Sequence, residues 1–393
     1  MNLLRVIGRE KELFAKDLSN YKDEINNLVS SSTFLILGGA GSIGQSVVKE
    51  IFKRNPKLIH VVDLSENNLV ELVRDLRSSL GYTQGEFKTF ALDIGSWQFQ
   101  NFISNQKAYD YVLNLSALKH VRSEKDVYTL LRMIEVNVFN TNLSIKHSIK
   151  KGVKKYFCVS TDKAANPVNM MGASKRIMEM FLAKYSNEID ISTSRFANVA
   201  FSDGSLLHGF NQRIQKNQPI VAPDDIERYF ITPKESGELC LFSALLGNNR
   251  EIFFPKLEGL SLTKFSDVAI NFLGELGLKP LLCESEEDAR NAIKIKGDQE
   301  WPCLFSESDT TGEKSYEEFY TNNEILDLER FESFGIVTSN HYIQEDKLKS
   351  FCRSMESIKN QKFISKKELL DLFCELIPNF EHQEKGKYLD SKM

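Results

Sequence analysis

The sequence from residue 35 to residue 44 reads Leu-Ile-Leu-Gly38-Gly39-Ala40-Gly41-Ser42-Ile43-Gly44. The apolar residues before the glycines predict a buried strand, and the residues after them predict a helix. Gly38 permits a tight turn, Gly41 lets the backbone approach a pyrophosphate, and Gly44 lets the helix pack closely on the strand. The free N–H groups of Ser42 and Ile43 at the helix N-terminus would attract the phosphates. The stretch therefore predicts a dinucleotide-binding turn.

Acidic residues after the next two strands indicate which dinucleotide binds. Asp63 follows the predicted strand Leu58–Val62, about twenty residues beyond the glycines, where a carboxylate accepts hydrogen bonds from ribose hydroxyls. Its charge would repel a 2′-phosphate and no arginine follows it, so we expect NAD rather than NADP. Asp93, followed by Ile94, comes after the strand Phe87–Leu92 and is placed to reach the adenine edge. The alternative for Asp93 is a helix N-cap.

Strands and helices alternate from residue 33 to residue 194. This order predicts an α/β fold, a doubly wound parallel sheet of the Rossmann type. The predicted strands are Thr33–Leu37, Leu58–Val62, Phe87–Leu92, Tyr109–Leu115, Lys155–Val159 and Ile189–Ser194, and the helices are Ser42–Lys53, Glu66–Leu80, Leu130–Lys150 and Met171–Tyr185.

The chain divides into four predicted regions: a helical extension 1–30, an NAD-binding domain 31–200, a smaller substrate-binding lobe 201–330 that returns to the sheet, and a helical extension 331–393. Residues 1–30 carry one apolar stripe at helical spacing. That helix either packs on its own chain or contacts another subunit. In the second half we expect helices at Glu235–Leu246 and 264–276, and a capping box at Ser365 and Glu368.

Composition excludes several classes of protein. The net charge is −4, so there is no basic excess for nucleic acid or an anionic membrane. The apolar runs are far shorter than the roughly 20 residues of a membrane span, and the charged N-terminus does not resemble a signal peptide. The six cysteines lack CxxC spacing, which favours reduced thiols and no metal site. We expect a cytoplasmic protein.

The chemistry is predicted to reside between residues 160 and 175. Thr161, Asp162 and Lys163 follow the strand Lys155–Val159, and the carboxyl ends of parallel strands face the ligand in such sheets. An adjacent carboxyl and amine can act as acid and base on neighbouring substrate atoms. The alternative is a helix cap beside a solvated lysine.

Lys175 lies four residues after Met171. In a large class of nicotinamide-dependent enzymes a tyrosine takes the methionine's place, and the lysine on the same helix face lowers the pKa of the phenol. Methionine cannot accept a proton. Either redox chemistry is lost in this chain, or another group accepts the proton.

Several motifs together resemble one family, the extended short-chain dehydrogenases that act as nucleotide-sugar 4,6-dehydratases. Within it the chain is most similar to UDP-N-acetylglucosamine 4,6-dehydratases of the CapD-like polysaccharide-biosynthesis branch. The resemblance covers roughly residues 33–325 and rests on the glycine turn, Ser116-Ala117-Leu118-Lys119-His120-Val121, Ser160–Ala164, Met171–Arg176, Arg195–Val199, Arg228–Phe230, Phe254-Pro255-Lys256, Asp309–Lys314 and Glu317-Glu318-Phe319.

The resemblance implies a redox-neutral reaction at a UDP-linked N-acetylhexosamine. Hydride leaves sugar C4 for NAD, water is lost across C5 and C6, and the hydride returns to C6. Lys163 would remove the C5 proton, Asp162 would protonate the C6 hydroxyl, and Thr161 would contact the C4 hydroxyl. Members with this methionine resemble those that retain the C5 configuration. The group that takes the C4 hydroxyl proton is either Asp162 or a Thr161–water relay.

The resemblance also implies binding roles. Lys175, Ser116 and Ala117 would hold the cofactor, and Lys119 and His120 would lie near the nicotinamide and the sugar. Asn198 would contact the diphosphate, and Arg228 and Lys256 would contact phosphate or uridine; surface charges are the alternative for these two. Arg195 could instead be a structural ion-pair partner. Family members associate through helices of the sheet domain, so a homo-oligomer is expected.

Two other functions stay open. An epimerase or reductase of nucleotide sugars would use the same scaffold without elimination. A non-catalytic NAD-binding sensor would explain the missing tyrosine, but not the presence of Lys175 beside Asp162 and Lys163. The sequence does not decide between UDP and GDP as the nucleotide.

Overall fold

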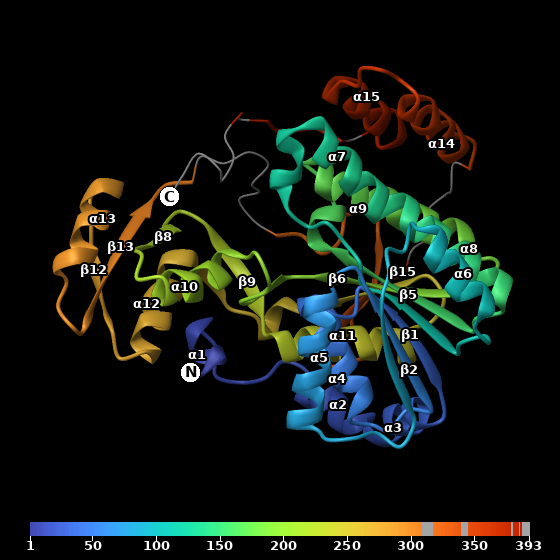
Figure 1. Cartoon of the computed structure of the whole chain (residues 1–393), viewed down its shortest axis with the longest axis horizontal. Coiled ribbons are helices and arrows are strands. Elements are labelled where there is room, and N and C mark those ends of the chain that lie inside the picture. The colour runs from blue at the N-terminus through green and yellow to red at the C-terminus, as the bar shows by residue number, and fades with distance from the viewer. Residues whose placement is uncertain (309–316, 339–344, 379, 385, 387–393) are drawn as a thin grey trace.

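The computed structural model describes residues 1–308, 317–338, 345–378, 380–384 and 386. A nine-stranded sheet in the order β14-β15-β10-β6-β5-β4-β1-β2-β3 forms its centre (Figure 1). The strands from β10 to β3 are parallel, and β14 and β15 are antiparallel at one edge. The predicted α/β fold is confirmed. The strands are β1 Thr33–Leu37, β2 Leu58–Asp63, β3 Glu86–Ala91, β4 Tyr111–Asn114, β5 Lys155–Thr161, β6 Asp190–Phe196, β10 Glu251–Pro255, β14 Ile325–Asp327 and β15 Phe334–Thr338.

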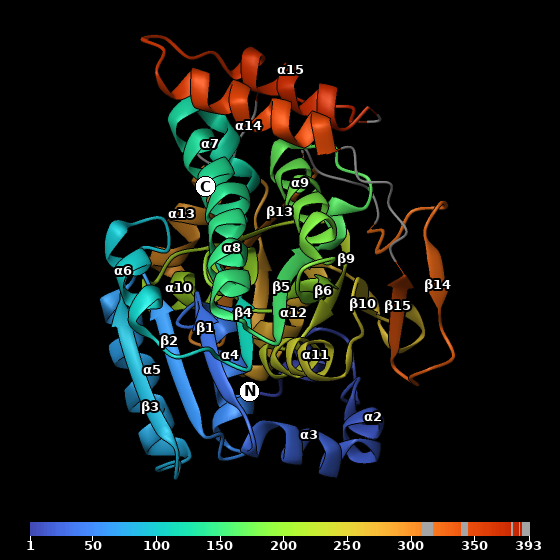
Figure 2. The same ribbon diagram turned by 90° about the vertical axis from the view of Figure 1, so that its right-hand side faces the viewer.

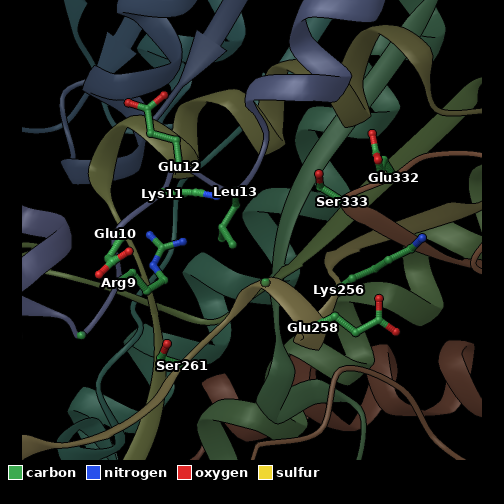
Figure 3. A pocket seen from close by; sticks show the side chains of 12 residues that line it. Arg9, Glu10, Lys11, Glu12, Leu13, Lys256, Glu258, Ser261, Glu332 and Ser333 are labelled. Atoms are coloured by element: carbon green, nitrogen blue, oxygen red, sulfur yellow. The ribbon is translucent and has the colours of Figure 1, made fainter.

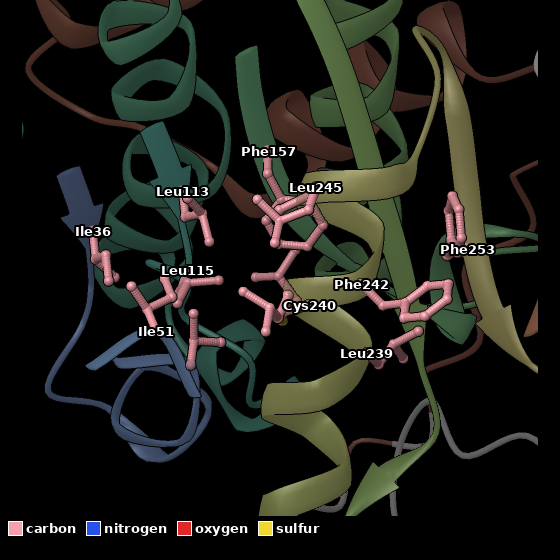
Figure 4. Packing of buried hydrophobic residues seen from close by; sticks show 14 of the residues in the cluster. Ile36, Ile51, Leu113, Leu115, Phe157, Leu239, Cys240, Phe242, Leu245 and Phe253 are labelled. Atoms are coloured by element: carbon pink, nitrogen blue, oxygen red, sulfur yellow. The ribbon is translucent and has the colours of Figure 1, made fainter. Parts of the chain in front are cut away.

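Successive residues of a strand point to opposite faces, and β1 supplies two separate cores in this way. Phe34 and Ile36 pack against α4 (Ser42–Phe52), α5 (Glu66–Ser79) and α11 (Pro233–Leu246). Leu35 and Leu37 pack on the other face, with α6 (Trp97–Asn105) and α9 (Met170–Tyr185). Figure 4 shows α11 presenting Leu239, Cys240, Phe242 and Leu245 to the first core. The sheet is thus covered on both faces, which explains why its strands read as continuous apolar runs.

The helix predicted at Leu130–Lys150 is wrong in detail. The chain instead forms α7 (Val127–Ile134), a π-helical turn (Glu135–Asn140) and α8 (Thr141–Lys151). α7 begins at Val127, three residues before the predicted start, because the side chain of the N-cap Asp126 accepts from the Tyr128 and Thr129 N–H groups. Gly152, with φ of 72°, ends α8.

The single N-terminal helix predicted for residues 1–30 is also wrong. Three helices replace it: α1 (Leu3–Val6), α2 (Ala15–Asn20) and α3 (Lys22–Ser30). Gly8, at a φ of 74°, turns the chain away after α1. Phe14 is fully buried and stacks on Phe334 with ring centroids 4.4 Å apart. The extension thus packs on its own chain, and contact with another subunit stays a prediction.

The lobe over the carboxyl ends of the strands is built from two small sheets. Their orders are β11-β9-β7 and β12-β13-β8. Helix α1 packs on α12, so Val6 and Ile7 belong to the lobe's own core. The elements are β7 Asn198–Val199, α10 Leu206–Gln215, β8 Ile220–Pro223, β9 Glu227–Ile231, β11 Leu262–Lys264, α12 Phe265–Glu275, β12 Lys279–Leu282, α13 Glu286–Ile295 and β13 Glu300–Ser306.

Two C-terminal helices, α14 (Glu345–Lys359) and α15 (Lys366–Leu376), lie over α7 and α9 (Figures 1 and 2). The predicted capping box at Ser365 forms only in half: its hydroxyl accepts from the Glu368 N–H, whereas the Glu368 carboxylate accepts from Gln361. A complete capping box joins Thr232 and Glu235 at the start of α11. None of the helices in the described part of the chain is long and apolar enough to cross a membrane.

Candidate functional site

The glycines of the β1–α4 turn occupy positions that favour glycine for different physical reasons. Gly38 adopts a φ of 71°, and a Cβ there would lie 2.7 Å from the Ser116 backbone nitrogen. A Cβ on Gly44 would lie 2.2 Å from the Gly38 carbonyl oxygen. A Cβ on Gly41, in contrast, would meet nothing closer than 3.7 Å. Packing within the protein therefore requires Gly38 and Gly44, while Gly41 leaves open backbone at the N-terminus of α4.

The two carboxylates predicted for the cofactor have different contacts. Asp63 ends β2, where one of its oxygens accepts from the Ala40 N–H and the other from the Ser65 N–H, both at 2.9 Å. Asp93 accepts from the Gly95 N–H and from the Arg132 guanidinium, each at 2.9 Å. The carboxylate of Asp93 is thus engaged within the protein.

The remaining residues predicted for the cofactor line the same sheet edge. The Ser42 hydroxyl accepts from the Asp203 N–H at 2.7 Å, and Ile43 packs partly buried against the first core. Ser116 and Ala117 follow β4 and are half-buried, and the Ser116 N–H donates to Asn114. Ile94 is buried in the second core. An open glycine, a helix N-terminus and Asp63 at the next strand's end are the features that a bound dinucleotide requires.

The predicted acid and base lie in contact at the end of β5. The Thr161 hydroxyl donates to Asp162 at 2.7 Å, and the Lys163 ammonium lies 3.2 Å from the same carboxylate. Asp162 is 4% exposed, and the Lys163 side chain is 26% exposed. Asp162 is therefore shielded from solvent, whereas the side chain of Lys163 is partly accessible.

Lys175 lies on α9, one turn after Met171, and both side chains are buried. Its ammonium donates to the Val159 carbonyl oxygen at 3.0 Å. Burial lowers the pKa of Lys175. Its cationic head is thus fixed on the backbone of β5, directly before the residues that carry the acid and the base.

The loop at residues 202–204 contacts Lys119 and His120. The Lys119 ammonium donates to the Ser202 hydroxyl at 3.0 Å. A Cβ on Gly204 would lie 2.8 Å from the His120 ring. Both side chains keep an exposed part, yet the protein atoms around them desolvate their charged forms and lower the pKa of each.

Glu317 lies at the site, although the sequence predicted no chemical role for it. Its carboxylate accepts from the side-chain amide of Asn198 and, at 2.9 Å, from the Tyr229 N–H, and Arg228 lies 4.0 Å away. Burial, followed by the negative charge of Asp162, raises the pKa of Glu317 to about 7. Its only sequence signal was the family-like Glu317-Glu318-Phe319, whose neighbour Asp309–Lys314 lies outside the described residues.

The alternative that we kept for Arg195, a structural ion pair, is what the structure shows. Its guanidinium is fully buried and pairs with Glu179 and Glu324, with N–O distances of 2.8 Å to each. It also donates to the Phe319 carbonyl oxygen at 2.8 Å. Arg195 therefore ties β6 to the segment that follows Glu317.

The structure does not bring Lys256 together with the acid and the base. Its ammonium donates to the carbonyl oxygens of Leu328 and Phe331. It lines a cavity of about 550 Å³ with residues 8–13, Glu258, Gly259, Ser261, Glu332 and Ser333 (Figure 3). This cavity contains both signs of charge and none of the residues at the end of β5.

Comparisons with known proteins all point to one family. The polysaccharide biosynthesis protein family matches residues 34–339. A protein of Methanocaldococcus jannaschii, named as an uncharacterized membrane protein, is 32% identical over 80% of this chain and 88% of its own length. The Campylobacter jejuni UDP-N-acetylglucosamine 4,6-dehydratase (inverting) is 26% identical over 88% of this chain and 98% of its own. The chain spans only 50% of the Staphylococcus aureus capsular polysaccharide biosynthesis protein CapD, with 30% identity.

Solved structures share the fold. The structure of Pen from Bacillus thuringiensis superposes with a TM-score of 0.65 at 24% identity, over 89% of this chain and 98% of that one. The dTDP-glucose 4,6-dehydratase DesIV of Streptomyces venezuelae, solved with NAD bound, gives a TM-score of 0.55 at 15% identity, over 73% and 88% of the two chains.

Proposed function

Because the chain belongs to the polysaccharide biosynthesis protein family of extended short-chain dehydrogenases, we propose that it is a nucleotide-sugar 4,6-dehydratase acting on UDP-N-acetylglucosamine. The observation that carries the proposal is the contact between Asp162 and Lys163 at the end of β5. Elimination of water needs an acid and a base on adjacent carbons, and hydride transfer alone does not.

The cofactor that we propose is NAD. Gly41 and the N-terminus of α4 would hold its pyrophosphate, and Asp63 would accept from ribose hydroxyls and disfavour a 2′-phosphate. Lys175 would contact the nicotinamide ribose. The bound nicotinamide supplies a hydride acceptor and donor, so that one cofactor serves every turnover.

The hydrogen bond between Thr161 and Asp162 suggests an answer to the question that Met171 raises. Thr161 receives the proton of the C4 hydroxyl and passes its own proton to Asp162. Asp162 then protonates the C6 hydroxyl, which leaves as water. Lys163, which must enter this step as the neutral amine, removes the C5 proton and returns a proton to C5 when hydride arrives at C6. These transfers balance, because each proton taken from the sugar leaves in the water or returns to C5.

Mass analysis after incubation with UDP-N-acetylglucosamine and, separately, its GDP counterpart tests the proposal. We expect a product lighter by one water from the UDP sugar alone. Lys163→Ala should abolish this product while NAD stays bound; Lys216→Ala, on the surface of the lobe, is the matched control. An isomer of unchanged mass would instead indicate an epimerase, the activity named for a Rickettsia bellii relative that is 28% identical over 57% of this chain.

Two finer points belong to the same proposal. In D₂O the nitrogen of Lys163 carries deuterons from the solvent, so we expect deuterium at C5 of the product and retention of the C5 configuration; an inverted C5 would contradict the role that we give to Met171. We also propose a cytoplasmic homo-oligomer. Since α14 and α15 lie over α7 and α9, a partner on that side of the sheet would meet these two helices.

A further inference from the structure

The end of the C-terminal extension returns to the start of α9. The Gln383 N–H donates to the Val168 carbonyl oxygen at 2.9 Å. Phe380 is 5% exposed and belongs to the same core as Met171. Residues 380–384 therefore lie against the segment that joins Lys163 to Lys175.

A buried carboxylate lies at this junction. Glu124 comes from the 3₁₀ turn Val121–Lys125, directly after Lys119 and His120, and its side chain is 0% exposed. One oxygen accepts from the Met171 N–H at 3.2 Å. The other lies 2.8 Å from Nε2 of His382. One side chain thus connects three segments that are far apart in the sequence.

The contact with Met171 matters because the first N–H groups of a helix have no partner within the helix. At the start of α9, Asn169 accepts from the Gly172 N–H at 2.8 Å, and Glu124 accepts from that of Met171. A carboxylate is favourable at this positive end of the helix. His382 in turn compensates the buried carboxylate, which would otherwise keep one oxygen without a partner.

The first turn of α9 is in contact with the base. A Cβ on Gly172 would lie 2.5 Å from the Lys163 carbonyl oxygen, so the two backbones touch. Lys175 follows in the next turn. A shift at the start of α9 therefore moves both Lys163 and Lys175.

We propose that the C-terminal extension is an intramolecular clamp on the catalytic segment, with His382 and Glu124 as positioning residues. Where it concerns turnover, the clamp rests on the proposed function. It gives a role to the C-terminal region, for which the sequence offered none.

The experiment compares three variants of the full chain. His382→Ala removes the partner of Glu124, and His382→Gln replaces it with an amide N–H. Phe351→Leu is the matched control, because Phe351 belongs to the same C-terminal extension but packs α14 between the rings of Phe139 and Phe373. Each variant is assayed for kcat and KM, NAD content, thermal stability and hydrogen exchange of the amides of residues 170–175.

We expect His382→Ala to lower kcat about tenfold and to change KM and NAD content less than about twofold, since small displacements of reacting groups act on rate more than on affinity. His382→Gln should recover most of the rate. Amides 170–175 should exchange faster in His382→Ala only. Unchanged exchange, no rescue by glutamine, or an equal kcat loss in a Phe351→Leu protein of equal stability would each overturn the clamp. If the wild-type protein turns over no sugar nucleotide, the proposed function fails, and the exchange result still decides the clamp.

Discussion

The substitution Glu317→Gln should stabilise the protein at alkaline pH and leave it unchanged at acidic pH. Burial and the charge of Asp162 raise the pKa of Glu317 from 4.5 to about 7. Below pH 4.5 the carboxyl is neutral in both the folded and the unfolded state. As the pH rises to 7, the unfolded chain releases this proton first, and the folded state loses stability relative to it.

The magnitude follows from the size of the shift. A change from 4.5 to about 7 corresponds to up to ~3 kcal/mol, all of it expressed above pH 7. Glutamine carries no charge at any of these pH values and can keep both contacts. Its carbonyl oxygen accepts from the Tyr229 N–H, and its amide donates to a flipped Asn198 side chain.

The assay is urea unfolding of wild type and variant at about pH 5 and about pH 8, followed by tryptophan fluorescence. Glu318→Gln is the matched control, because the neighbouring carboxylate accepts from Asn166 and is only half-buried. We expect most of the stability gain of Glu317→Gln to appear at the higher pH, with only a small part of it at about pH 5. An equal effect at both pH values, or a gain only at the lower one, would refute the raised pKa of the buried Glu317.

Three further substitutions test other parts of the structure. Arg195→Met leaves Arg176 as the remaining cation beside the buried carboxylates of Glu179 and Glu324. It should lower the free energy of unfolding by about 3 kcal/mol in urea titrations, whereas a loss below about 1 kcal/mol would contradict the ion-pair network. Gly44→Ala should abolish NAD binding in calorimetry, because its Cβ would collide with the Gly38 carbonyl oxygen; Gly209→Ala, in open space, should not. Asp63→Ser should narrow the preference for NAD over NADP in fluorescence titrations, and an unchanged ratio would show that Asp63 does not select the cofactor.

The sheet could be predicted because its signals are local. Each central strand is a short apolar run, and the glycines of the β1–α4 turn have steric reasons that lie within the turn and in the adjacent β4 loop. The contact between Asp162 and Lys163 could be predicted for the same reason, since neighbours at the end of one strand need no knowledge of the rest of the chain.

Features that depend on distant partners could not be predicted. β7 contains only two residues, too few to show a periodicity, and it is defined by its pairing with β9. Glu317 joins the site because Arg195 holds the backbone at Phe319, a contact between remote segments. No glycine or proline marks the break between α7 and α8 in the sequence, because the π-helical turn continues the helical direction.

The stacking of Phe14 on Phe334 has a consequence for synthesis on the ribosome. The N-terminal helices leave the exit tunnel first, but the ring that covers Phe14 and the N–H groups of Glu332 and Ser333 that bind Asp17 are made more than three hundred residues later. Domains made during translation generally fold as units from the N-terminus. A nascent chain that stops before residue 334 therefore lacks the ring that stacks on Phe14, so the N-terminal helices cannot complete their packing until β15 has been translated.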